Sequence, residues 1–197
     1  MTKVILASQS PRRKQLLEWA AIDFDIIVKS TDETYPEGLS PEAVAIHIAK
    51  QKNIAVRAAD QCKVYSADIP VISADTIVVC NDIIMGKPAN RNDAIQILNT
   101  LSGKKHLVIT GVVISAGEKE TSFSDTTEVW FHPLTNEQIE FYVDRYQPYD
   151  KAGAYAIQEW IGVVGIERIN GDFYNVMGLP VSRVVRELGE FENAGMY

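Results

Sequence analysis

The chain has few of the side chains that build disulfide frameworks and transition-metal sites. Its 197 residues include two cysteines and three histidines. Cys62 and Cys80 form no CxxC or other metal-binding pattern, and the histidines stand far apart, at His47, His106 and His132. The simplest inference from this cysteine usage is a reduced, cytoplasmic protein.

Long apolar runs and an excess of positive charge are also missing. The apolar stretch Val4 to Ala7 is too short for the core of a signal peptide, and no run approaches the length of a membrane span. The formal net charge of −7 argues against a general nucleic-acid binder, which would normally present a basic face. We therefore expect neither a membrane nor a nucleic acid as a partner. A small anionic substrate would need cations gathered at its site.

The best-known catalytic signatures are absent as well. The sequence has no GxxxxGK[ST] loop, GxGxxG fingerprint, HExxH or GxSxG motif. No histidine stands where it would be a base for a nucleophilic serine. Repeats, low-complexity tracts and linkers are also lacking, and a hydrophobic content of 46% is ordinary for a globular protein. We expect a single domain over residues 1–197.

The most informative stretch that is present opens the chain. Val4 to Ala7 has the length of a buried strand, and Ser10 followed by Pro11 is typical of the start of a helix. A helix N-terminus favours acidic residues, yet Arg12 and Arg13 stand in the first turn. Two guanidinium groups beside free backbone N–H groups would suit a bound anion such as phosphate. The alternative is that both arginines are solvated surface residues.

Helices and strands alternate irregularly after this first helix, which we expect to bury Leu16, Leu17 and Trp19. Asn81-Asp82 predicts a hairpin turn, and Thr135 to Gln138 predicts a capping box. Further helices are expected over residues 41–59, 91–101 and 135–144 and from 179 onward. Strands are expected over residues 24–28, 71–79, 83–85, 107–115, 121–131 and 163–169. This mixture predicts an α/β fold with a mixed sheet flanked by helices.

Carboxylates stand in two unusual places. Asp75 interrupts the apolar strand 71–79, where a carboxylate costs free energy unless it has a partner, and Glu33 follows another strand. Carboxylates select hard cations such as Mg²⁺ or Mn²⁺, and nearby basic side chains would bind phosphate oxygens. The set suits metal-assisted attack of water on a phosphoanhydride. A structural interpretation fits the spacing equally well. In it, Asp75 is a capped, hydrogen-bonded turn residue and Lys87 is an exposed lysine of the hairpin.

Several longer motifs together resemble the Maf family of nucleotide pyrophosphatases, once called septum formation inhibitors. They cover nearly the whole chain in the family's order. The motifs are Ser8-Gln9-Ser10-Pro11-Arg12-Arg13 with Leu16-Leu17, Ser73-Ala74-Asp75-Thr76, Gly86-Lys87-Pro88, Leu101-Ser102-Gly103 with His106, Thr110-Gly111-Val112, Lys151 to Gln158, Ile169-Asn170-Gly171-Asp172, and Asn175 to Pro180.

The resemblance implies an activity, a cofactor and a fold. The activity is hydrolysis of a nucleoside triphosphate to the monophosphate and pyrophosphate, with a divalent cation, Mg²⁺ or Mn²⁺. The fold would be similar to that of inosine triphosphate pyrophosphatases, with an elongated mixed sheet and a central cleft between two lobes. The family also implies a homodimer.

The resemblance further implies the site residues. Asp75 matches the family's proposed catalytic acid/base, and Arg12, Thr76 and Gln158 match the positions linked to substrate choice. In the branch acting on dTTP and UTP these motifs read SPR, ADT and IQ, as they do here, whereas the 7-methyl-GTP branch resembles SPW, SDQ and SEG. One departure is Glu159-Trp160, where a glycine is common after the glutamine.

Our hypothesis at this stage assigns a role to each candidate. Glu33 and Asp75 hold the metal ion, and Asp75 is a base, a metal ligand or both. Gln158 and Thr76 read a pyrimidine edge. The phosphate-binding candidates are Ser8, Arg12, Arg13, Lys52 and Lys87.

Two rival functions remain open from the sequence. The first is a nucleotide-binding regulator of cell division that acts through a protein partner, as the family's older label suggests. The second is house-cleaning of modified pyrimidine nucleotides or of other non-canonical ones. Retention of both carboxylates and of the phosphate-binding candidates favours an enzyme over a pure sensor.

Overall fold

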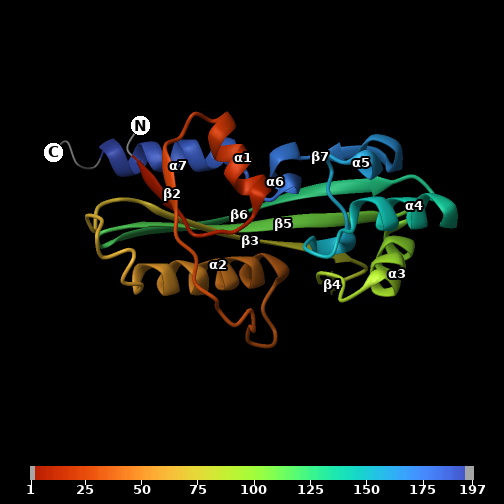
Figure 1. Ribbon diagram of the computed structural model, residues 1–197, viewed down its shortest axis with the longest axis horizontal. Helices are drawn as coiled ribbons and strands as arrows, with labels where there is room; N and C mark the ends of the chain where they lie inside the picture. Colours follow the sequence, from red (N-terminus) through yellow and green to blue (C-terminus); the bar gives the residue numbers. More distant parts are fainter. Residues whose placement is uncertain (1–2, 194–197) are drawn as a thin grey trace. The chain divides into compact units, whose positions relative to one another are not determined.

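The computed structural model describes residues 3–193, which form a seven-stranded mixed sheet with helices packed on it (Figure 1). The strands are β1 (Val4–Leu6), β2 (Phe24–Ile26), β3 (Val71–Cys80), β4 (Ile83–Met85), β5 (Lys105–Ala116), β6 (Lys119–Phe131) and β7 (Ile166–Asn170). The helices are α1 (Pro11–Trp19), α2 (Pro41–Arg57), α3 (Arg91–Leu101), α4 (Asn136–Tyr146), η1 (Ala152–Ala154), α5 (Trp160–Gly165), α6 (Phe173–Met177) and α7 (Val181–Asn193).

The strand order is β2-β1-β3-β5-β6-β7, and β4 pairs with β3. β1 runs parallel to both β2 and β3, whereas the β3–β4 and β6–β7 pairs are antiparallel. The predicted α/β class with a mixed sheet and flanking helices is therefore confirmed. Parallel pairing needs crossover connections, and α1 supplies the one between β1 and β2.

Contacts along the chain divide the described residues into two compact units. Unit 1 contains residues 3–75, 110–125 and 178–193, and unit 2 contains residues 76–109 and 126–177. β3, β5 and β6 contribute residues to both units. The single domain over residues 1–197 and the cleft between two lobes of an elongated sheet stay predictions.

In unit 1, α2 lies directly against β5. A Cβ atom at Gly111 would lie 2.3 Å from the backbone carbon of Ala45 in α2, so no side chain fits there. Asn53, also in α2, donates through its amide to the carbonyl of Val71 at 3.0 Å and accepts from the hydroxyl of Ser115 at 2.7 Å. The close contact and the satisfied amide hold α2 at a fixed height above the strands.

In unit 2, a buried aromatic cluster surrounds one histidine. His106 in β5 is 1% exposed and lies 2.8 Å through Nε2 from the hydroxyl of Tyr155. Both rings pack edge-on against Phe131, with ring centroids 5.0 Å apart in each case. Burial lowers the pKa of His106 to about 4, so the imidazole is neutral at physiological pH.

Local capping signals were good predictors. The side chains of Ser10, Ser40 and Thr135 each accept a backbone N–H at the start of a helix, and Thr135 forms the full capping box with Gln138. Asn81 and Asp82 have φ of 52° and 62° and turn β3 into β4, as a two-residue hairpin turn requires.

Two local expectations were wrong, and one short helix was missed. Residues 163–165 belong to helix α5 rather than to a strand, because the carbonyl of Glu159 accepts the N–H groups of Gly162 and Val163. Trp19 is 60% exposed, because the buried face of α1 consists of Arg13, Leu16 and Leu17. Helix α6 was not expected, since only five residues form it.

None of the helices in the described part of the chain combines the length and the apolarity that crossing a membrane requires.

We predict that Gly111→Ala lowers the free energy of unfolding by about 2 kcal/mol or more, because the added methyl group would overlap the backbone of α2. Urea unfolding followed by circular dichroism measures the change. Gly189→Ala in α7 is the matched control, since a Cβ atom there meets nothing within 4 Å. The control should stabilise the protein by up to ~1 kcal/mol. Equal effects at both sites would contradict the packing argument.

A second prediction concerns the pH dependence of stability. The folded state holds His106 at a pKa of about 4, below the usual 6.5, so the unfolded chain binds a proton first as the pH falls. The free energy of unfolding should therefore decrease between pH 6.5 and 4, by up to roughly 3 kcal/mol from this residue. His106→Gln should flatten this part of the pH profile in denaturant titrations. A variant with the wild-type slope would show that His106 is not the cause.

Candidate active site

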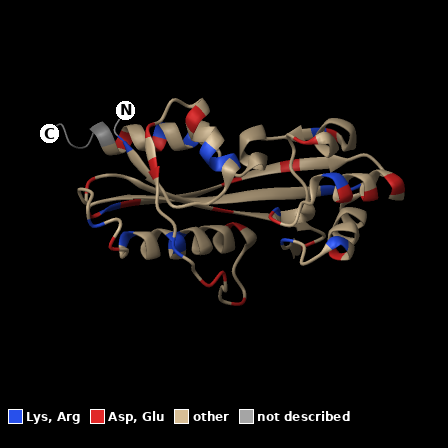
Figure 2. Cartoon of the chain, viewed as in Figure 1, with Lys and Arg blue, Asp and Glu red and all other residues tan. Residues whose placement is uncertain are grey.

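A short loop joins β1 to α1 and brings backbone donors and basic side chains together. The hydroxyl of Ser8 accepts the N–H of Ser10 at 3.2 Å, and the hydroxyl of Ser10 accepts the N–H of Arg13. Pro11 opens the helix, whose first turn has no acidic residue. Basic residues of α1 are visible in Figure 2. The predicted helix start is confirmed, and its charge pattern suits an anion rather than the helix itself.

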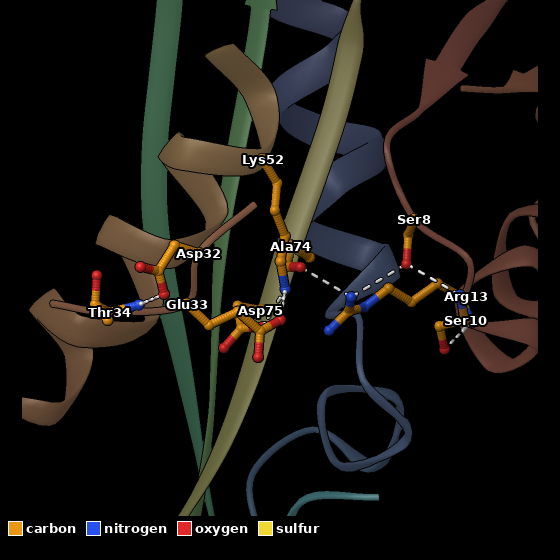
Figure 3. A network of polar contacts seen from close by, with 9 residues as sticks. All are labelled: Ser8, Ser10, Arg13, Asp32, Glu33, Thr34, Lys52, Ala74 and Asp75. Carbon is orange, nitrogen blue, oxygen red and sulfur yellow. Dashed lines mark hydrogen bonds and ion pairs between the residues drawn. The ribbon is translucent and has the colours of Figure 1, made fainter. Parts of the chain in front are cut away.

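Arg13 connects the start of α1 to two distant segments of unit 1, and Figure 3 shows its contacts with Ser8 and Ala74. Its side chain is buried, and Nε donates to the carbonyl of Gly178 at 2.7 Å. Nη1 donates to the carbonyl of Ala74 in β3 at 2.8 Å and lies 3.2 Å from the hydroxyl of Ser8. Burial lowers the pKa of Arg13, and the charge of Asp75 opposes that shift. Arg13 therefore holds the loop before α1 against the middle of β3.

Asp75 follows Ala74 in β3, and its side chain is 11% exposed. The ammonium of Lys52, from α2, donates to Oδ1 of Asp75 at 2.6 Å. The same nitrogen lies 2.8 Å from Oε1 of Glu33 (Figure 3). Lys52 is thus the partner that a carboxylate inside a strand requires, and it connects two carboxylates that are far apart in the sequence.

The converging carboxylates provide a test of whether a divalent ion fits. The described residues contain no group of three or more His, Cys, Asp or Glu side chains that could hold a metal. Glu33 and Asp75 nevertheless share a single ammonium group, that of Lys52. Two carboxylates beside one ammonium still attract a further cation. Mg²⁺ is commonly bound by one or two carboxylates together with substrate phosphates. The residues fit such an ion if a bound phosphate completes its coordination.

The remaining predicted site residues have different places. Arg12 precedes Arg13 in α1 and is half-buried. Thr76, Lys87 and Gln158 belong to unit 2, where Thr76 is half-buried and the other two are exposed. The structure joins Ser8, Arg13, Glu33, Lys52 and Asp75 in one polar network within unit 1. That the other four act at the same site stays a prediction.

Sequence reasoning missed the backbone groups that anchor Arg13. The carbonyl of Gly178 lies 165 residues away in the chain, and no local pattern indicates this contact. Gly178 has a φ of 120°, which glycine adopts without strain, and the Leu-Pro pair that starts the α7 region follows it. A glycine two residues before a proline was therefore the available signal. It could not identify the partner.

Comparison with curated proteins finds relatives over nearly the whole chain. A dTTP/UTP pyrophosphatase of Cytophaga hutchinsonii is 49% identical over 195 residues, which cover 98% of this chain and 85% of that protein. A dTTP/UTP pyrophosphatase of Parabacteroides distasonis is 46% identical, covering 96% of each. One of Bacillus cereus is 47% identical, covering 97% of this chain and 96% of its own.

Among solved structures, the Staphylococcus aureus Ham1 protein is similar with a TM-score of 0.45 and 14% identity, over 66% of this chain and 72% of that chain. A TM-score of this size decides nothing about the fold. The family model described as Maf-like protein matches residues 3–191, which is nearly every residue of the chain. This chain belongs to the family of Maf-like proteins.

Proposed function

We propose that this chain hydrolyses dTTP and UTP to the nucleoside monophosphate and pyrophosphate. The curated relatives bear the name dTTP/UTP pyrophosphatase and match almost from end to end. The observation that carries the proposal is the network of Glu33, Lys52 and Asp75 in unit 1. It gathers two carboxylates and a cation around the middle of β3, where ionised groups contribute little to stability, and such a cluster is typical of a functional site.

In the proposed reaction Asp75 is the general base. Its carboxylate accepts a proton from a water molecule while the water oxygen forms a bond to the α-phosphorus. The bond between the α-phosphorus and the bridging oxygen breaks, and pyrophosphate leaves with that electron pair. Lys52 orients Asp75 through the 2.6 Å hydrogen bond. Holding the base in a fixed orientation lowers the entropic part of the activation barrier.

Basic side chains would neutralise the triphosphate. We assign direct contacts with phosphate oxygens to Arg12, Lys52 and Lys87. Ser8 and Arg13 would act at the same end of the substrate. Because Nε and Nη1 of Arg13 already donate to protein oxygens, its main contributions are its charge and the fixed position of the loop.

Glu33 and Asp75 would hold a Mg²⁺ or Mn²⁺ ion together with phosphate oxygens. When bound, such an ion supplies charge compensation for the phosphoryl oxygens and the departing pyrophosphate. Lys52 already lies between these carboxylates and would remain their hydrogen-bond donor from the side of α2.

Base selection is assigned to Thr76 and Gln158, with Arg12 beside the phosphates. The hydroxyl of Thr76 and the amide of Gln158 offer both donors and acceptors, as the edge of thymine or uracil requires. A site that hydrogen-bonds one base edge rejects bases that leave its polar groups unpaired.

A homodimer and a cytoplasmic location complete the proposal. Exposed apolar side chains on α4 and α5, Phe141, Val163 and Val164, support self-association of unit 2. Cys62 and Cys80 are both buried and free, which suits a reducing compartment. Sedimentation analysis of the purified protein tests the dimer.

The function is tested by product analysis. The protein is incubated with Mg²⁺ or Mn²⁺ and a panel of canonical and modified nucleoside triphosphates, and the products are separated. We expect pyrophosphate and monophosphate from dTTP and UTP, and loss of activity in a chelator that is restored by either metal. Cleavage of many modified bases would indicate wider house-cleaning. No release from any nucleotide would overturn the proposal and favour a regulator that acts by binding.

We predict that Asp75→Asn lowers kcat by about 10²- to 10⁴-fold, because the amide cannot accept the proton. Steady-state kinetics with dTTP measures the change, and circular dichroism checks the fold. Asp60→Asn is the control, since Asp60 is a highly exposed surface residue that pairs with Lys63 of the same loop region. Near wild-type turnover by Asp75→Asn would contradict the mechanism.

A further inference from the structure

The turn that presents Gln158 in unit 2 is followed by an acidic residue with no obvious task in its own helix. Glu159 is the N-cap of α5, yet its side chain makes no capping hydrogen bond. The N–H of Gly162 donates instead to the backbone carbonyl of Glu159 at 2.9 Å. The carboxylate, 21% exposed, is directed to other partners.

Tyr142 of α4 contacts the turn at two points. Its side chain is completely buried, and its hydroxyl donates to Oε2 of Glu159. The same hydroxyl accepts the backbone N–H of Ala156 at 3.2 Å. One oxygen atom therefore binds the residue two positions before Gln158 and the residue directly after it. The N–H of Glu159 also donates to the carbonyl of Ala156 at 3.1 Å, which closes the turn.

Lys151 provides the positive charge of this network. Its side chain is 9% exposed, and Nζ lies 3.6 Å from Oε1 of Glu159 and 2.8 Å from Oδ1 of Asp150. An ammonium group with so little access to water needs anionic partners. Glu159 thus accepts from a buried hydroxyl on one side and faces a buried ammonium on the other.

α5 packs directly on the same turn. A Cβ atom at Gly162 would lie 1.7 Å from the carbonyl oxygen of Ile157, so only glycine allows this approach. The backbone is fixed on both sides of Gln158, and the Gln158 side chain itself remains exposed. This arrangement restricts the turn and leaves the amide available to a ligand.

We propose that Glu159 is a positioning residue for base recognition: with Tyr142 and Lys151 it fixes the turn from which Gln158 presents its amide. The inference rests on the proposed function, in which Gln158 reads the pyrimidine. An amide held in one place discriminates between base edges, whereas a mobile amide can turn over and accept either pattern.

The test compares Glu159→Gln and Tyr142→Phe with the wild-type enzyme. Both variants preserve side-chain volume and remove the charge or the hydroxyl. The measurement is kcat and KM for dTTP, UTP and CTP with Mg²⁺. We expect KM for dTTP and UTP to rise and the preference over CTP to fall by roughly two- to tenfold, with kcat less affected. Glu167→Gln, an exposed carboxylate on β7, is the matched control and should leave these values unchanged.

A double-mutant cycle separates positioning from a general loss of stability. In a Gln158→Ala background, Glu159→Gln should change the base preference no further, because the group that it positions is gone. Variants that melt at lower temperature but keep the wild-type base preference would overturn the inference and leave the proposed function intact. A wild-type enzyme that releases no pyrophosphate from dTTP, UTP or CTP would instead overturn the proposed function, and this inference with it.

Discussion

The centre of unit 1 depends on the ion pairs that the ammonium group of Lys52 forms with two carboxylates. Asp75 lies in a strand whose other residues are almost all buried, and its carboxylate is compatible with that place because Lys52 is 2.6 Å away. Removing one member of a largely buried ion pair typically costs about 3–5 kcal/mol. Glu33 uses the same nitrogen, so an exposed loop is attached to the sheet through a helix side chain. Stability and the proposed chemistry therefore share one charge.

Arg13 performs a different task with the same sign of charge. Lys52 contacts carboxylates, whereas Arg13 donates to the carbonyls of Ala74 and Gly178. Its contacts fix backbone, and those of Lys52 fix ionised side chains. Because Ala74 directly precedes Asp75, the two cations hold neighbouring residues of β3 from different elements. A carboxylate so constrained keeps its direction without help from a ligand.

Local chemistry made much of the fold predictable. The serine and threonine caps, the Asn81-Asp82 turn and the need of Asp75 for a partner all follow from groups close in the sequence. The bond from Arg13 to Gly178 could not be predicted, since loop closure over such a separation leaves no local pattern. Val163 in α5 shows the opposite failure, because its N–H donates to the carbonyl of Glu159 in a helical turn despite the strand preference of a β-branched residue. Asp75, Glu33 and the arginines of α1 stood out by their places in the sequence, and Thr76 and Gln158 came from motif resemblance. The ion pairing came only from the structure.

The contact between α2 and β5 has a consequence for the reach of Lys52. Ala45 touches the backbone at Gly111, and Lys52 follows it by two helical turns on the same face of α2. The height of the helix above the sheet therefore determines whether the lysine nitrogen meets Asp75 or falls short of it. Gly111, which carries no side chain, thus allows α2 to lie at the height from which Lys52 reaches Asp75.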